Sequence, residues 1–205
     1  MTLPSVLYLA SQSPRRLELL QQIGIPCSVM VADIDETVQN MELPEDYVVR
    51  LAIEKAKAGW NRVSSQNQAV LGSDTAVVIN GKILGKPNDA SDAKRMLYLL
   101  SGQTHQVMTA VALATRSGDS AVPEVNYVLN INDVSFKVLS DKEISDYVAT
   151  GEGLDKAGAY AIQGFAAAFI CHLSGSYSGV MGLPLYETVE LLEKAGIRRD
   201  SLVVS

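Results

Sequence analysis

The chain has 205 residues, enough for one compact domain or two small lobes sharing a core, and too few for a multidomain assembly. Its 47% hydrophobic and 20% charged residues are typical of globular proteins, which excludes predominant disorder. A net charge of −6 argues against the cation-rich face that duplex binding needs. No apolar run approaches the roughly 20 residues that span a bilayer, and residues 1–5 lack the start of a secretory signal. We therefore expect a cytoplasmic protein with neither a membrane nor a nucleic-acid partner.

The few cysteine and histidine residues limit the kinds of metal site and catalytic triad that the chain can form. Cys27 and Cys171 lie far apart and form no C-x-x-C pair, so both are predicted to be buried free thiols. With only His105 and His172, a three-histidine zinc site is impossible. A Ser-His-acid triad would need one of these two histidines, and neither has a recognisable nucleophile motif beside it.

The first elements along the chain form a predicted strand–loop–helix unit. Residues 6–10 are an apolar run typical of a strand, and a helix is expected from Pro14, with Ser13 as its N-cap and Gly24 after its end. The first turn of this helix carries Arg15 and Arg16, although the positive end of the helix dipole disfavours cations. Free backbone N–H groups and two guanidinium groups together predict a phosphate site.

The rest of the chain alternates helical and strand patterns. The helical patterns predict helices from about residue 44, over 89–100, after a capping box at 140 and 143, and from about 184 to 195. The strand patterns predict a strand over 69–79 that turns at 80–81 into a second strand over 82–84. Further strands are predicted at 106–115, 125–138 and 167–173. Residues 63–68 and 117–124 read as ordinary connections. This mixture predicts an α/β fold with helices flanking one mixed sheet, within a single domain over 1–205.

Two charged residues stand where the patterns ask for apolar ones. Lys55 falls on the apolar stripe of its helix, either reaching outward to the surface or aimed into a cleft towards an anion. Asp74 interrupts an apolar strand, where a buried carboxylate needs a partner or a metal. If Asn80-Gly81 is a two-residue turn, the register counted outward brings Lys86 diagonally beside Asp74. These residues form either a structural ion pair or part of an active site.

Two further polar features leave their alternatives open. The acidic residues Asp33, Asp35 and Glu36 form either a solvated loop or part of a site for Mg²⁺ delivered with a polyphosphate. Gln163 is either an exposed loop residue or a buried amide that could satisfy the imide edge of uracil or thymine. The sequence has no P-loop and no G-x-G-x-x-G after a strand, so the common nucleotide-binding motifs are excluded.

The sequence contains six short blocks in this order: LASQSPRR at 9–16, GSDT at 72–75, GKP at 85–87, LLSGQTH at 99–105, DKAGAYAIQG at 155–164 and GLP at 182–184. Together they resemble the signature of the Maf family of nucleoside triphosphate pyrophosphatases. The block at 155–164 is similar to the branch acting on dTTP and UTP, rather than to the branch acting on 7-methylguanosine triphosphate. Ser73 and Gln12 depart from the commoner residues without removing a charged or specificity position.

The resemblance implies an elongated mixed sheet with two lobes around a central cleft, a homodimer, and dependence on a divalent metal, Mg²⁺ or Mn²⁺. It implies that Asp74 accepts the proton and that Arg15, Thr75 and Gln163 set substrate specificity. It also places Glu36, Lys55 and Lys86 among the polar residues of the cleft.

The expected reaction is therefore hydrolysis of a nucleoside triphosphate to monophosphate and pyrophosphate. Ser11, Ser13, Arg16, Lys55 and Lys86 are expected to hold the phosphates, and Glu36 and Asp74 the metal. Asp74 is expected to act as general base, metal ligand or both. A 7-methylguanosine triphosphate pyrophosphatase and a nucleotide-binding cell-division regulator without turnover are the alternatives.

Overall fold

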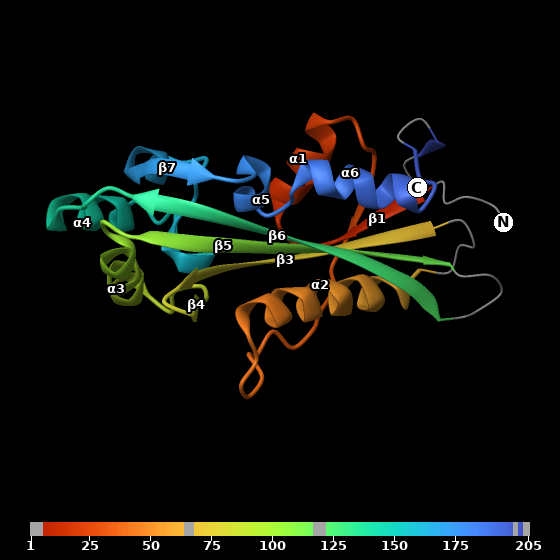
Figure 1. Cartoon of the computed structure of the whole chain (residues 1–205), viewed down its shortest axis with the longest axis horizontal. Coiled ribbons are helices and arrows are strands. Elements are labelled where there is room, and N and C mark those ends of the chain that lie inside the picture. Colours follow the sequence, from red (N-terminus) through yellow and green to blue (C-terminus); the bar gives the residue numbers. More distant parts are fainter. Residues whose placement is uncertain (1–5, 64–67, 117–121, 199–200, 203–205) are drawn as a thin grey trace. The chain divides into compact units, whose positions relative to one another are not determined.

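The computed structural model describes residues 6–63, 68–116, 122–198 and 201–202 (Figure 1). The predicted features at residues 1–5, and the parts of the two predicted connections at 64–67 and 117–121, lie outside the described residues. A seven-stranded mixed sheet has the order β2-β1-β3-β5-β6-β7, with β4 paired to β3. The predicted mixed α/β fold is confirmed.

The strands and helices have the following bounds. The strands are β1 Val6–Ala10, β2 Ser28–Met30, β3 Gln68–Ile79, β4 Lys82–Leu84, β5 Thr104–Arg116, β6 Pro123–Phe136 and β7 Ile170–Ser174. The α-helices are α1 Pro14–Gln22, α2 Pro44–Trp60, α3 Ala90–Leu100, α4 Asp141–Ala149, α5 Tyr177–Met181 and α6 Leu185–Lys194, and the 3₁₀ helices are η1 Ala157–Ala159 and η2 Phe165–Phe169. Within the described ranges, no helix is both long enough and apolar enough to cross a membrane.

The chain divides into two compact units. Unit 1 comprises Met1–Asp74, Thr109–Asn130 and Gly182–Ser205, and unit 2 comprises Thr75–Met108 and Ile131–Met181. The chain passes from one unit to the other inside β3, β5 and β6, and again between Met181 and Gly182.

Unit 1 is built around β1, which pairs in parallel with β2 on one side and β3 on the other. Leu9 pairs with Leu71 and Ala10 with Gly72. All four are buried, as expected for parallel strands covered on both faces. Figure 1 shows α2 and α6 on opposite sides of these strands. The three-residue edge strand β2 was not predicted, because so short a segment has no readable alternation.

Gly72 lets α2 approach β3 closely. A Cβ atom at this position would lie 2.3 Å from the backbone oxygen of Ala52 and 2.6 Å from the backbone nitrogen of Ala56. The absence of a side chain at Gly72 therefore brings the helix that carries Lys55 against the strand that carries Asp74.

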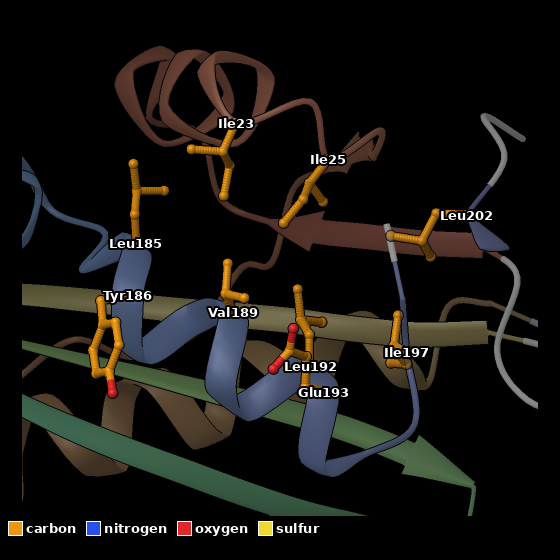
Figure 2. Close-up of a pocket in the computed structure, with 9 residues that line it drawn as sticks. All are labelled: Ile23, Ile25, Leu185, Tyr186, Val189, Leu192, Glu193, Ile197 and Leu202. Atoms are coloured by element: carbon orange, nitrogen blue, oxygen red, sulfur yellow. The ribbon is translucent and has the colours of Figure 1, made fainter. Parts of the chain in front are cut away.

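An apolar pocket of about 510 Å³ lies in unit 1 between α6, the residues that follow α1 and those that follow α6 (Figure 2). It is lined by Ile23, Ile25, Leu185, Tyr186, Val189, Leu192, Glu193, Ile197 and Leu202. Its one charged lining residue among those described is an acid, so the pocket does not suit a triphosphate.

Unit 2 confirms the predicted β3–β4 hairpin. Ile79 pairs with Lys82 and Val77 with Leu84, and the turn residues Asn80 and Gly81 have φ of 50° and 72°. The strand β4 ends at Leu84, so the antiparallel pairing does not continue to Lys86 as the extrapolated register assumed.

The helices of unit 2 enclose its apolar core. The capping box predicted for α4 is confirmed, since Ser140 Oγ accepts from the backbone N–H of Glu143 and the Glu143 carboxylate accepts from that of Ser140. Leu97, Leu100, Phe136 and other buried side chains fill the space between these helices and the strands of the unit.

Two local predictions were wrong in part. The predicted strand over 167–173 is split into η2 and β7, because Ala166 and Phe169 are buried at helical spacing. Ser13 is the N-cap residue of α1 as predicted, although its side chain makes no capping hydrogen bond. Both cysteines are free as predicted, yet Cys27 is only partly buried and Cys171 is exposed on the β7 strand.

Candidate functional site

The loop between β1 and α1 is organised around the hydroxyl group of Ser11. This buried oxygen accepts hydrogen bonds from the backbone N–H of Ser13, at 3.1 Å, and from Nη1 of Arg16, at 3.1 Å. The loop follows the carboxyl end of a parallel strand and opens a helix, which is where α/β proteins bind anions.

Arg15 and Arg16 bring two positive charges to the start of α1, whose first turn contains no acidic residue. Burial lowers the pKa of Arg16, and the positive charge of Arg15 adds to this effect. The negative charge of nearby Asp74 acts in the opposite direction and raises the pKa. An arginine stays protonated in spite of such a shift, so the site holds a concentrated positive charge that an anion would relieve.

The backbone oxygen of Gly182 joins this loop to β3. It accepts a hydrogen bond from Arg16 Nε at 2.8 Å and another from the buried Ser73 hydroxyl at 3.0 Å. The Ser73 side chain therefore has a structural partner in the fold. Sequence reasoning did not assign a role to Gly182, because nothing in the local pattern reveals the target of a carbonyl group.

Lys55 connects two acidic residues. Its Nζ lies 2.7 Å from Asp74 Oδ1 and 2.6 Å from Glu36 Oε1. The Lys55 and Asp74 side chains are 10% and 11% exposed, whereas the Glu36 side chain is 49% exposed, so the group runs from the interior to the surface. Lys55 therefore points inward rather than to the surface, and the anions that it contacts are carboxylates of the protein itself.

The buried position of Asp74 controls its protonation. Burial raises the pKa of this carboxyl group, while the charges of Lys55 and Arg16 and the hydrogen bond from Lys55 oppose the rise. Tyr47 belongs to the same neighbourhood: burial, Asp74 and Glu36 raise the pKa of its phenol to about 12. A carboxylate with a raised pKa is a stronger proton acceptor than an ordinary one, which suits the role of a general base.

The structure thus brings together five predicted residues of unit 1, Ser11, Arg16, Glu36, Lys55 and Asp74. Ser13 and Arg15 lie in the same loop and helix start. Sequence reasoning missed Tyr47, whose hydroxyl donates to the backbone oxygen of Glu36 at 3.0 Å.

Thr75, Lys86 and Gln163 belong to unit 2, and their convergence with Asp74 stays a prediction. Thr75 is half-buried, while Lys86 and Gln163 are exposed, so the buried alternative for Gln163 is wrong. The backbone N–H of Gly158 donates to the oxygen of Gly85 at 3.1 Å, which joins the segments of Gln163 and Lys86. Gly158 has φ of 67°, and a Cβ there would lie 2.8 Å from Val77 Cγ1, so this contact depends on glycine.

The acidic residues of the site suit a metal ion that arrives with its substrate. Among the described residues, no group of three or more His, Cys, Asp or Glu side chains is arranged to hold a metal ion. Glu36 and Asp74 offer two carboxylates around Lys55. Mg²⁺ characteristically uses one or two carboxylates together with substrate phosphates and water, so these residues fit such an ion.

Comparison with known proteins agrees with this arrangement. Residues 6–195 match the family model described as Maf-like protein. The chain is 51% identical over 197 residues to a dTTP/UTP pyrophosphatase of Pseudoalteromonas atlantica, covering 95% of this chain and all of the relative. It is 52% identical over 194 residues to the protein of that name from Escherichia coli O157:H7, covering 95% of each, and 49% identical over 200 residues to that of Ralstonia nicotianae, covering 93% and 94%. With similarity of this extent over both units, the chain belongs to the Maf family.

Proposed function

We propose that this protein hydrolyses dTTP and UTP to the nucleoside monophosphate and pyrophosphate. The observation that carries the proposal is the buried Lys55–Asp74 pair, 2.7 Å apart, in the same unit as the cationic loop at the start of α1. Relatives about half identical over nearly the whole chain bear the name dTTP/UTP pyrophosphatase, which supports the choice of base.

The chain's own cations and amides bind the triphosphate in this account. The backbone N–H groups of the loop at Ser11–Ser13 and the guanidinium groups of Arg15 and Arg16 contact phosphate oxygens. Lys55 and Lys86 supply further positive charge, with Lys55 exchanging a carboxylate contact for a phosphate contact. These contacts hold the α-phosphorus in place for attack.

Asp74 takes a proton from the attacking water. The water oxygen bonds to the α-phosphorus, the bond to the bridging oxygen breaks, and pyrophosphate leaves with that electron pair. A divalent ion, Mg²⁺ or Mn²⁺, held by Glu36 and Asp74 would neutralise phosphate charge when bound. The raised pKa of Asp74 supports its role as proton acceptor, and its oxygens suit the role of metal ligand as well.

Specificity for the pyrimidine is assigned to Arg15, Thr75 and Gln163. Gln163 lies at an exposed position, where its amide can donate to and accept from the imide edge of uracil or thymine. We also propose that the protein acts as a homodimer in the cytoplasm, and light scattering of the purified chain tests the oligomeric state.

Product analysis tests the proposal. The protein is incubated with Mg²⁺ and dTTP, UTP or 7-methylguanosine triphosphate, and the products are separated by ion exchange. Monophosphate and pyrophosphate from dTTP and UTP are expected. Orthophosphate with a nucleoside diphosphate would contradict the assigned bond, and cleavage of 7-methylguanosine triphosphate alone would contradict the assigned base.

A further inference from the structure

The segment that carries Glu36 is held by side chains of α2. Residues 31–43 form neither helix nor strand, so no ladder of backbone hydrogen bonds fixes this stretch. Two consecutive carbonyl groups are bound from α2 instead: Tyr47 Oη donates to the Glu36 oxygen at 3.0 Å, and Arg50 Nη2 donates to the Thr37 oxygen at 3.1 Å. The backbone at Glu36 therefore takes its position from the helix that also carries Lys55.

Arg50 is itself held by a bidentate contact with one carboxylate, and its Nη1 also donates to Glu54 at 3.4 Å. Its Nε and Nη2 donate to the two oxygens of Glu42 at 2.6 and 2.9 Å, and the Glu42 side chain is only 8% exposed. Glu42 Oε2 also accepts from the backbone N–H of Gln39 at 2.9 Å, so the same carboxylate ties down the far end of the segment. The guanidinium carbon lies 5.6 Å from the centre of the Tyr47 ring. A bidentate pair of this kind has a fixed geometry that lysine cannot reproduce.

The pKa values of Arg50 and Glu42 are consistent with a stable ion pair between them. The hydrogen bond from Arg50 holds the pKa of Glu42 below its ordinary value, and Glu42 in turn raises the pKa of Arg50. Both groups therefore stay ionised at neutral pH. By contrast, the Lys55–Glu36 ion pair is half-exposed at its acidic end, and such pairs contribute little to holding a loop in place.

We propose that Tyr47, Arg50 and Glu42 form a clamp that positions the Glu36 carboxylate for the metal ion that accompanies the substrate. The three are positioning residues, because none of these contacts involves the reacting atoms. Tyr47 binds the backbone oxygen of Glu36, Arg50 binds that of the next residue, Thr37, and Glu42 holds Arg50 in place. The inference rests on the proposed function for the role of Glu36. It adds that the affinity of the metal is set by residues outside the site.

The test measures metal binding without turnover. Mn²⁺ is titrated into the protein with a UTP analogue whose α–β bridge is a methylene group, and the free ion is followed by electron paramagnetic resonance. Arg50→Lys and Tyr47→Phe are each expected to weaken Mn²⁺ binding about tenfold, at the lower end of the losses seen for residues that orient metal ligands. Arg95→Lys, which alters an exposed Arg–Asp92 pair on α3, is the matched control and is expected to leave binding unchanged.

A double-mutant comparison separates positioning from general loss of structure. In a Glu36→Gln background, Arg50→Lys is expected to cause no further weakening, because its effect passes through Glu36. The same tenfold loss in both backgrounds, or unchanged binding in Arg50→Lys and Tyr47→Phe proteins with wild-type thermal unfolding, would overturn the clamp. Unchanged Mn²⁺ binding in Glu36→Gln would overturn it as well. Hydrolysis of dTTP by the wild-type protein tests the proposed function separately.

Discussion

Asp74 has a buried carboxylate whose environment disfavours its charge, although Lys55 lies 2.7 Å away. Burial is the largest influence on its pKa and outweighs the nearby cations. Such a residue reduces the stability of the free protein, but it is a stronger base than an exposed aspartate. The proposed catalytic role therefore predicts a separation between activity and stability at this position.

Asp74→Asn is expected to abolish turnover without lowering the melting temperature. The pKa of Asp74 is higher in the folded protein than in the unfolded chain, so its negative charge destabilises the folded protein. This destabilisation is fully present above the folded-state pKa, and it disappears as the pH falls below the pKa of the unfolded chain. The variant should therefore melt higher than the wild type at pH 8, and this difference should narrow on acidification. Calorimetry at several pH values measures it, and near-normal activity in the variant would contradict the assignment.

His105 predicts a different pH dependence in unit 2. Its ring is 2% exposed and Nε2 lies 2.8 Å from the hydroxyl of Tyr160, and burial lowers its pKa to about 4. A lowered pKa contributes stability that is present above about pH 6.5 and is lost as the pH falls towards 4. The loss in the free energy of unfolding from this one histidine is on the order of 3 kcal/mol.

Urea unfolding of His105→Gln and wild-type protein at pH 7 and pH 4.5 measures this contribution. The wild type is expected to lose more free energy of unfolding on acidification than the variant. His172→Gln, at an exposed position on β7, is the control and should behave as wild type. Equal losses in all three proteins would show that His105 does not drive the pH response.

At the scale of elements, the site depends on how closely α2 lies against β3. Lys55 comes from the helix and Asp74 from the strand, and Gly72, two residues before Asp74, provides the contact. A methyl group at Gly72 would clash with helix backbone, which cannot rotate away as a side chain can. The helix would have to move, and Lys55 would move with it.

Gly72→Ala is therefore expected to destabilise the protein by about 1–3 kcal/mol and to lower kcat together with stability. Denaturant unfolding and steady-state kinetics check both effects. Gly85→Ala is the control for stability, since a Cβ there has no heavy atom within 4 Å. Wild-type stability in Gly72→Ala would mean that α2 and β3 can separate without loss.

The elements that sequence reasoning predicted well have strong local signals. The β3–β4 hairpin is specified by Asn80-Gly81 and α4 by its capping box, and both occur as expected. β2 and η2 were missed because a three-residue edge strand and a short 3₁₀ turn depend on tertiary contacts rather than on a repeating pattern. The extrapolation to Lys86 failed because strand pairing stops at Leu84, and no local signal marks that end.

The same distinction between local sequence signals and tertiary contacts applies to the residues of the candidate site. Lys55 and Asp74 were recognisable because each violates the apolar pattern of its element, and the structure pairs them. Tyr47 and Arg50 were not, since a polar residue on an amphipathic helix conforms to the pattern whatever it contacts. The role of Gly182 could not be predicted either, because its backbone oxygen makes the contact and every residue has such an oxygen.

For the molecule as a whole, the bond after Asp74 is one of the places where the chain crosses between its two units. The proposed proton acceptor thus ends one unit, and Thr75, assigned to specificity, begins the other. The loop proposed to bind phosphate, Lys55 and Glu36 belong to unit 1, and Lys86 and Gln163 belong to unit 2. The proposed function therefore assigns the proton acceptor and most of the phosphate contacts to residues of unit 1.

The proposed reaction is attack of water on the α-phosphorus with Asp74 as proton acceptor. Its point of attack is tested by hydrolysis of dTTP in water enriched in ¹⁸O, followed by mass spectrometry of both products. Attack on the α-phosphorus predicts one ¹⁸O atom in the thymidine monophosphate and none in the pyrophosphate. Label in the pyrophosphate would place the attack on the β-phosphorus and contradict the account.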